Sequence, residues 1–313
     1  MHANEIASDN VPRFAAAGRY LQTRFATPVR DRRNLRSSVG WLGTAIRSQD
    51  RSSSEPLLKR IILFRFHNSL DICANRLELL HRFNPGASII GLWGGDRSGL
   101  LEARQALASR LEYIWEIPMK SPLWKWQHAD LSLLMWYRHE GRHIPFDMLH
   151  LVEWDLLLLA SLDRIYGETG RGGVALTGLT PLERIRHNWY WTSVEPYATQ
   201  WRQLQEHVRD HYGWQGPHSA CQGPASAFSK AFLERCSQEE IPELVNEELR
   251  IPLYAHALGF KVVGLPHIYR EIKNPREMKF FNCEKLPIKE RTIRWELLKP
   301  WGRRVFHPYR KIW

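Results

Sequence analysis

The amino-acid sequence lacks the patterns that mark membrane-spanning, secreted or zinc-finger proteins. No apolar run approaches the roughly 20 residues of a membrane span, because Glu153, Asp155 and Asp163 interrupt the longest one. The first residues contain no apolar segment of the kind found in signal peptides. The four cysteines have no CxxC spacing, so the sequence indicates neither a zinc site nor a disulfide framework. We therefore expect a cytoplasmic protein.

Two ligand-binding motifs are incomplete. The glycine-rich stretch Gly167–Gly173 has no Gly-Lys-Ser/Thr ending and precedes a predicted strand, which favours a simple loop over a phosphate-binding loop. His207 and His211 lie four residues apart on a predicted helix but lack the glutamate of the His-Glu-x-x-His motif. That spacing therefore favours an exposed polar face over a zinc site.

Positive charge is concentrated at the two ends of the chain. Residues 1–60 carry 11 Lys and Arg against 5 Asp and Glu, and residues 261–313 carry 14 against 5. Residues 61–260 hold the remaining 19 basic against 23 acidic side chains. An acidic centre argues against a nucleic-acid-binding protein. Basic ends fit peripheral contact with an anionic membrane at its inner face, or a polyanionic partner, or simple solubility.

The composition, 43% hydrophobic and 25% charged, is that of a folded protein with a sizeable core. Residues 1–56 mix Arg, Ser, Asn and Pro and end in a Ser-rich segment, which predicts a basic N-terminal extension and linker. We expect the folded domain over residues 57–270 and a basic C-terminal extension over residues 271–313.

Short apolar runs alternate with stretches of helical spacing from residue 57 onwards. The runs predict buried strands at Ile61–Phe64, Ser88–Trp93, Tyr113–Ile117, Met148–Val152, Gly173–Thr177 and Lys261–Leu265. The stretches between them predict helices at Leu70–Phe83, Leu123–His139, Tyr197–His211 and Asn246–Leu258. Strand and helix in alternation predict an α/β fold with a parallel sheet and crossover helices.

Polar and small residues follow several of the predicted strands. In open α/β sheets ligands bind outside the carboxyl ends of the strands. The residues that follow the first two strands are therefore candidates for binding a nucleotide: His67, Asn68, Asp71, Gly94, Gly95 and Asp96. Ordinary helix capping by Asn68 and Asp71 is the simpler alternative.

Glu153-Trp154-Asp155 is the sharpest motif in the chain. Two carboxylates one residue apart, directly after an apolar strand, point to the same side if the chain stays extended. Such a pair repels itself unless a divalent cation or a basic partner lies between the two groups. Mg²⁺ or Mn²⁺ bridging a diphosphate is one reason for the arrangement. The alternative is that one carboxylate caps a helix and the other is solvated.

A second acidic pair, Glu247-Glu248, opens the predicted helix Asn246–Leu258, where the helix dipole favours negative charge. The small-residue stretch Gly223–Ser229 precedes it and would let the backbone approach a ligand closely. Trp189 and Trp191 could offer flat faces to a sugar ring in an acceptor site, or could simply fill the core.

Together these motifs resemble the glycosyltransferases of the GT-A fold, which use nucleotide-sugar donors. The resemblance rests on the order and spacing of His67–Asp71, Glu153-Trp154-Asp155, Gly223–Ser229 with Glu247-Glu248, and His267, over residues 60–270. It implies a Rossmann-like, mixed but mostly parallel sheet. The chain departs from the Asp-x-Asp of that superfamily by having Glu153 at the first position.

The resemblance also assigns roles. It implies that Glu153 and Asp155 hold Mn²⁺ or Mg²⁺, with His267 able to complete the metal site, and that Glu248 or Glu247 faces the acceptor as the catalytic carboxylate. The function implied is transfer of a sugar from a nucleotide-sugar donor to a glycan or lipid-linked acceptor, in glycan or polysaccharide synthesis.

Two other functions stay open from the sequence. A nucleotidyltransferase could use the same acidic pair, but a basic glycine-rich signature is expected after its first strand, where this chain has Phe66-His67-Asn68. A non-catalytic carbohydrate-binding protein could use the tryptophans and the basic ends. In that protein Glu153, Asp155 and Glu248 would be unimportant.

Overall fold

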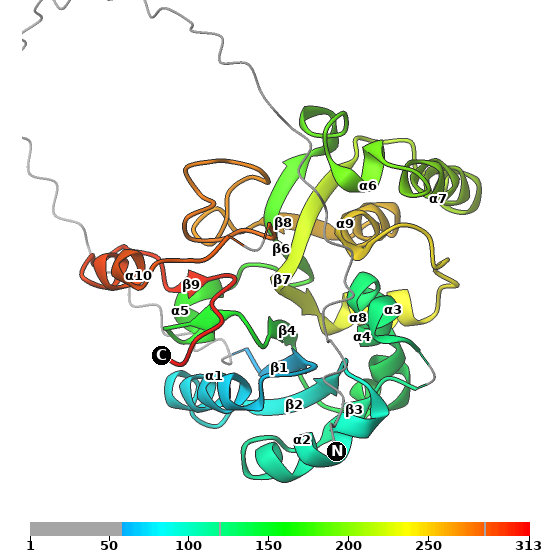
Figure 1. Ribbon diagram of the computed structural model, residues 1–313. Helices are drawn as coiled ribbons and strands as arrows, with labels where there is room; N and C mark the ends of the chain where they lie inside the picture. The colour runs from blue at the N-terminus through cyan, green and yellow to red at the C-terminus, as the bar shows by residue number, and fades with distance from the viewer. Residues whose placement is uncertain (1–57, 119, 285) are drawn as a thin grey trace, which may run out of the picture. The chain divides into compact units, whose positions relative to one another are not determined.

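The protein is described by a computed structural model that covers residues 58–313 except residues 119 and 285 (Figure 1). The predicted N-terminal extension and linker, residues 1–56, lie outside the described residues. The described residues belong to one compact unit.

The centre of this unit is a seven-stranded mixed sheet with the order β3-β2-β1-β4-β7-β6-β8. All neighbouring strands run parallel except β7, which is antiparallel to β4 and to β6. The strands are β1 (Arg60–Phe66), β2 (Ser88–Trp93), β3 (Ile114–Glu116), β4 (Met148–Glu153), β6 (Gly173–Pro181), β7 (Ser219–Ser229) and β8 (Lys261–Gly264). A second sheet pairs β5 (Leu157–Leu158) with β9 (Val305–Phe306).

Ten α-helices connect and flank these strands in the described part of the chain. They are α1 (Leu70–Phe83), α2 (Leu100–Leu107), α3 (Pro122–Gln127), α4 (Ala129–His139), α5 (Leu162–Tyr166), α6 (Tyr190–Ser193), α7 (Tyr197–Tyr212), α8 (Lys230–Ser237), α9 (Glu247–Ala257) and α10 (Glu290–Leu297). None of the helices between residues 58 and 313 is long and apolar enough to cross a membrane.

Helices cover both faces of the main sheet because its strands are apolar on both sides. Along β1, Ile62, Phe64 and Phe66 pack into a core with α1 and α2, whereas Ile61 and Leu63 pack into a second core with α4 and α8. Successive side chains of a strand point to opposite faces, so a continuous apolar run fills two cores. The predicted α/β fold, a mixed and mostly parallel sheet flanked by helices, is confirmed.

The sequence missed strand β7, which lies between β4 and β6. Its small residues, predicted only as a close-approach segment, carry no β-branched side chain. The strand is irregular, with register shifts against β6 and a positive φ of 63° at Ala225. Pairing with β4 and β6 therefore makes this segment a strand, although its residues have little intrinsic preference for that conformation.

The predicted helix Leu123–His139 is two helices, α3 and α4. The break falls at His128, whose φ of −128° and ψ of 51° are not helical. Ser121 caps the first turn of α3 by accepting a hydrogen bond from the backbone N–H of Trp124.

Residues 271–313, predicted as an extension, pack into the same compact unit as the sheet. Phe306 of β9 pairs with Leu157 of β5, and both are buried in a third apolar cluster with Ile293 of α10. The guanidinium of Arg76 on α1 also donates hydrogen bonds to the backbone carbonyl of Tyr309, at 2.6 Å. Burial of this apolar surface holds the C-terminal segment against β5. Two residues of this segment, His307 and Arg310, therefore reach the site described next.

Candidate functional site

The carboxyl end of β4 carries a buried cluster of charged side chains. Arg65 on β1 stands opposite Glu153 in the parallel register, and its Nη2 lies 2.5 Å from Oε1 of that carboxylate. Both side chains are nearly buried, so the pair is shielded from water. Burial alone would lower the pKa of Arg65, but the carboxylates of Glu153 and Glu247 outweigh it and raise that pKa.

Asp155 is held from the other side by the C-terminal segment. His307 Nε2 lies 3.3 Å from Oδ1 of Asp155, and Arg310 Nε lies 3.0 Å from Oδ2. Burial alone would raise the pKa of Asp155, but His307 and Arg310 lower it well below its usual range. Asp155 is therefore ionised, and its charge in turn raises the pKa of His307 against the effect of burial.

These contacts depend on the short sheet formed by β5 and β9. The chain turns at Glu153–Leu156, where the N–H of Leu156 donates to the carbonyl of Glu153, and then enters β5. Pairing of β5 with β9 brings His307 next to Asp155, and the N–H of Tyr309 donates to the carbonyl of Asp155 at 2.8 Å. No local pattern in the sequence predicts His307 or Arg310 as partners of Asp155, because they lie about 150 residues further along the chain.

The predicted carboxylates lie together, but with His307 and not with His267. One ligand atom each of Glu153, Asp155 and His307 lies within 4.8 Å of the others, the arrangement needed to hold a cation. Oδ1 of Asp155 is buried, and the polar group that contacts it is the imidazole of His307 at 3.3 Å. His267 instead pairs its Nε2 with the backbone carbonyl of Ile165 at 2.7 Å.

An open pocket of about 550 Å³ lies at the carboxyl ends of β1 and β2. Four of the residues predicted to bind a nucleotide line it: His67, Asn68, Asp71 and Asp96. Partial desolvation, together with the positive charges of Arg65 and Arg310, lowers the pKa of His67 to about 4 although the side chain is open to the pocket, so this imidazole is neutral. Its ring packs edge-on against Trp154, with 5.4 Å between the ring centroids. Trp154 separates Glu153 from Asp155, so the pocket adjoins the charged cluster.

The other two predicted residues, Gly94 and Gly95, form the turn before Asp96 and are not among the residues that line the pocket. A Cβ added to Gly95 would lie 2.4 Å from the ring of Trp93 and 2.8 Å from the backbone carbonyl of His67, so no side chain fits there. The carbonyl of Gly95 accepts a hydrogen bond from Nζ of the buried Lys125 at 2.8 Å. These contacts fix the turn that carries Asp96.

Glu247 and Glu248 begin α9 as predicted, with Asn246 as the capping residue. Nη1 of Arg65 lies 3.9 Å from Oε2 of Glu247, and Trp191 donates a hydrogen bond from Nε1 to Oε2 of Glu248 at 2.8 Å. The helix dipole was expected to keep Glu248 ionised. Burial has the larger effect, and it raises the pKa of both carboxyl groups to about 8.

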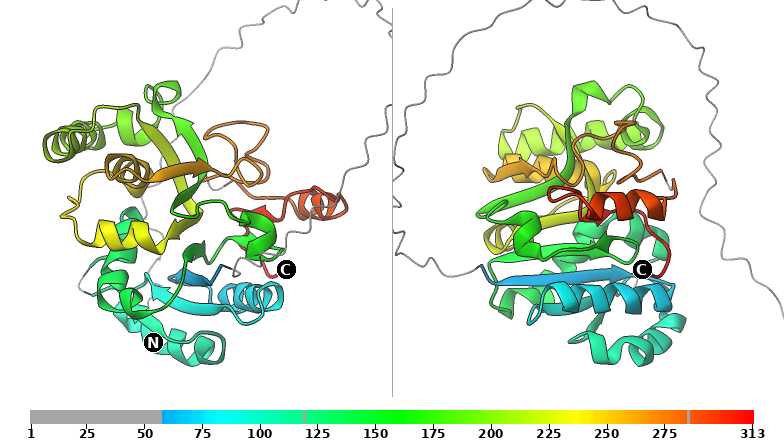
Figure 2. Two further views of the ribbon diagram at one scale, coloured as in Figure 1. Left: turned by 180° about the vertical axis from the view of Figure 1, so that it is seen from behind. Right: turned by 90° about the vertical axis from the view of Figure 1, so that its left-hand side faces the viewer.

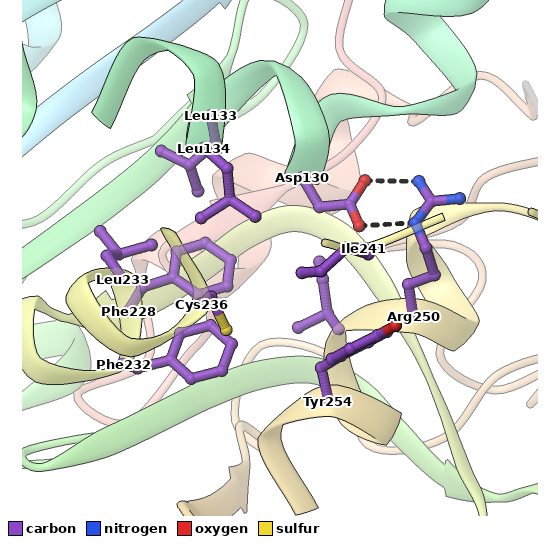
Figure 3. Close-up of a pocket in the computed structure, with 11 residues that line it drawn as sticks. Asp130, Leu133, Leu134, Phe228, Phe232, Leu233, Cys236, Ile241, Arg250 and Tyr254 are labelled. Carbon is purple, nitrogen blue, oxygen red and sulfur yellow. Dashed lines mark hydrogen bonds and ion pairs between the residues drawn. The ribbon is translucent and has the colours of Figure 1, made fainter. Parts of the chain in front are cut away.

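The N-terminus of α9 is held in place by a buried ion pair, shown in Figure 3. Arg250 faces Asp130 of α4 with two hydrogen bonds of 2.8 and 2.5 Å, beside an apolar cavity of only about 20 Å³. The same guanidinium donates to the backbone carbonyls of Leu244 and Val245. A cavity of this size holds at most about one water molecule, so this feature supports the site structurally.

The two tryptophans predicted to bind an acceptor are placed as in the stated alternative, in which they fill the core. Trp189 and Trp191 are both buried, and the indole N–H of Trp191 donates the hydrogen bond to Glu248 described above. The exposed aromatic residue of this region is Trp126, 46% exposed, whose ring centroid lies 6.1 Å from that of Trp191. The sequence missed Trp126 and Arg65. A lone arginine near the end of an apolar strand was the one available signal for Arg65.

Comparison with known proteins gives little direct guidance. No protein-family model matches the chain, and no curated protein sequence matches it. Among solved structures, the chain is similar to the apo structure of the bifunctional glycosyltransferase WbbM, with 10% sequence identity and a TM-score of 0.39. The match covers 81% of this chain and 46% of that one, so it spans about half the length of WbbM. We therefore base the function on the geometry of the site.

Proposed function

We propose that this protein is a glycosyltransferase that moves a sugar from a nucleotide-sugar donor to an acceptor hydroxyl. One observation carries the proposal: His67, which lines the open pocket at the carboxyl ends of β1 and β2, packs against Trp154, between the clustered carboxylates Glu153 and Asp155. In α/β sheets this edge is where nucleotides bind.

The pocket suits the nucleoside part of such a donor. Its volume falls in the usual range for small-molecule sites, about 300 to 1,000 Å³. Asn68, Asp71 and Asp96 offer hydrogen-bonding groups, and the neutral His67 offers both a donor and an acceptor nitrogen. A diphosphate extending from this pocket towards Trp154 would meet Arg310, whose side chain is half exposed and lies over the indole ring.

The charged cluster also fits a divalent cation. Two carboxylates and an imidazole are ligands that such ions accept, and in this structure Arg65, His307 and Arg310 pair with the two carboxylates. Glu153, Asp155 and His307 would hold the ion, as Mn²⁺ or Mg²⁺. When bound, it would neutralise charge on the departing diphosphate. Arg310 is a second source of positive charge for the same purpose.

Glu248 is the proposed general base of the acceptor side. In the reaction the bond between the sugar carbon and the diphosphate breaks, the acceptor oxygen bonds to that carbon, and the acceptor proton passes to Glu248. The hydrogen bond from Trp191 fixes this carboxyl group. Its pKa of about 8 lies close to working pH, where a general base is most effective. The exposed ring of Trp126 could support an acceptor sugar.

The test uses the full chain and a panel of UDP-, GDP- and dTDP-sugars with and without Mn²⁺. We expect one donor to raise the melting temperature, as any ligand specific for the folded state does. Asp155→Asn should abolish the Mn²⁺-dependent part of this rise and the transfer reaction. Glu248→Gln should keep the rise but lower turnover by roughly 10²-fold or more.

Glu206→Gln, on the exposed face of α7, is the matched control and should behave as the unaltered protein. The proposal fails if no nucleotide sugar binds, or if folded Asp155→Asn and Glu248→Gln both turn over normally. The product separates the alternatives: sugar transfer releases a nucleoside diphosphate, whereas a nucleotidyltransferase reaction releases inorganic pyrophosphate.

A further inference from the structure

The C-terminal part of the fold exposes a group of large apolar side chains next to basic ones. Trp295 is 63% exposed, Leu298 is 78% exposed and Trp301 is 97% exposed. The exposed basic residues among them are Arg291 and Lys299. We call these five residues the α10 patch.

The patch combines the outward face of the amphipathic helix α10 with the residues that directly follow it. The inward residues Ile293 and Leu297 pack against the apolar cluster of β5 and β9. Arg291, Trp295 and Leu298 are spaced at i, i+4 and i+7, so they share the opposite face. Figure 1 shows α10 at the edge of the fold, and in the right-hand view of Figure 2 it faces the viewer.

Exposure of these side chains is not required by the fold. Ile293 and Leu297 already anchor the helix, and polar residues at 295, 298 and 301 would be compatible with the same packing. Exposed apolar residues gathered on one surface mark interaction sites in soluble domains. The α10 patch is therefore a candidate docking surface.

The chemistry of the patch identifies its partner. Between residues 286 and 301 the exposed charged side chains are four basic ones and Glu290; Arg294 is paired with Glu290, and Lys299 with the buried Glu296. Exposed Arg164 of α5 adds positive charge, since its guanidinium donates to the carbonyl of Pro300. Tryptophan, leucine and basic residues on one helix face are typical of segments that lie in the interface of anionic membranes.

A second copy of the chain fits the patch less well. In a twofold-symmetric dimer each patch would meet its own copy, so positive charge would face positive charge. An anionic lipid surface instead offers negative headgroups to Arg291 and Lys299 and an apolar layer to the indole rings.

We propose that the α10 patch docks this protein onto anionic lipid membranes. The patch is also joined to the candidate site, because the segment that leaves Trp301 forms β9 and then presents His307 and Arg310 to Asp155. Membrane docking would thus place the candidate site close to the lipid surface. The docking itself does not depend on the proposed glycosyl transfer.

The test is co-sedimentation of the full chain with vesicles of phosphatidylcholine alone or with 30% phosphatidylglycerol. We expect binding to the anionic vesicles only, and weaker binding in high salt. The double variant Arg291→Glu/Lys299→Glu should weaken binding by about 30-fold or more, since each basic residue near an anionic surface contributes roughly fivefold. Trp295→Ala/Trp301→Ala should weaken it by about tenfold or more through lost apolar burial.

Matched controls lie on the exposed face of α2, with Leu101→Ala for the apolar change and Arg104→Glu for the charge reversal. Both should bind vesicles as the unaltered chain does. Lys299→Glu also removes the ion pair with the buried Glu296, so circular dichroism must show that each variant is folded before its binding is compared. Binding that ignores lipid charge, or that survives both double variants, overturns the proposal. The proposal is also overturned if the chain binds no vesicles and instead forms a dimer that the patch variants disrupt.

Discussion

Glu247 offers a direct test of how burial controls the candidate site. Its side chain is buried beside Gly223, where an added Cβ would lie 2.3 Å from Oε1 of Glu247. In the described structure Oε2 has no hydrogen-bond partner, and its nearest cation is Arg65 at 3.9 Å. Burial, together with the nearby carboxylates of Asp130, Glu153 and Glu248, raises the pKa from 4.5 to about 8.

This shift predicts that the protein loses stability as the pH rises. Below the pKa of the unfolded state the carboxyl group is protonated in both states. Between about pH 5 and 8 the unfolded chain releases the proton while the folded protein keeps it, so unfolding becomes easier. At about 1.4 kcal/mol per pKa unit the full effect is on the order of 5 kcal/mol. Relaxation around the charge reduces the expected loss to about 2 kcal/mol.

Glu247→Gln removes the titrating group and keeps the shape of the side chain. We expect its free energy of unfolding to increase, relative to the unaltered protein, by about 2 kcal/mol between pH 5 and 8.5. Urea denaturation followed by tryptophan fluorescence measures this difference. The exposed variant Glu206→Gln should show no such pH-dependent gain. If Glu247→Gln and the unaltered protein have parallel pH profiles, Glu247 is not held protonated by burial.

Two further predictions concern the elements that hold the site. Arg250→Met leaves Asp130 buried without its ion-pair partner, and we expect the free energy of unfolding to fall by about 3 to 5 kcal/mol in urea denaturation. Tyr166→Phe removes the hydrogen bond from its hydroxyl to the carbonyl of Ala225, 2.8 Å long, and should cost about 1 kcal/mol in the same assay. A loss below 1 kcal/mol for Arg250→Met would show that the pair does not fix α9.

The sequence by itself determined the class of fold and placed the candidate acidic residues at the ends of particular strands and helices. Apolar runs such as Ile61–Phe64, flanked by helical spacing, mark strands buried on both faces, because period and hydrophobicity are local properties. The same local reasoning placed Glu153 and Asp155 at the end of a strand and Glu247 at the start of a helix, and the structure has them there.

Only the tertiary structure decided which partners these carboxylates meet. His307 and Arg310 reach Asp155 because β9 pairs with β5, a contact between residues about 150 apart that no local pattern encodes. The small-residue strand β7 likewise exists because its neighbours β4 and β6 supply its hydrogen bonds. The protonation of Glu247 and Glu248 also depends on the fold. The helix dipole can be read from the sequence, but the desolvation that outweighs it comes from long-range packing.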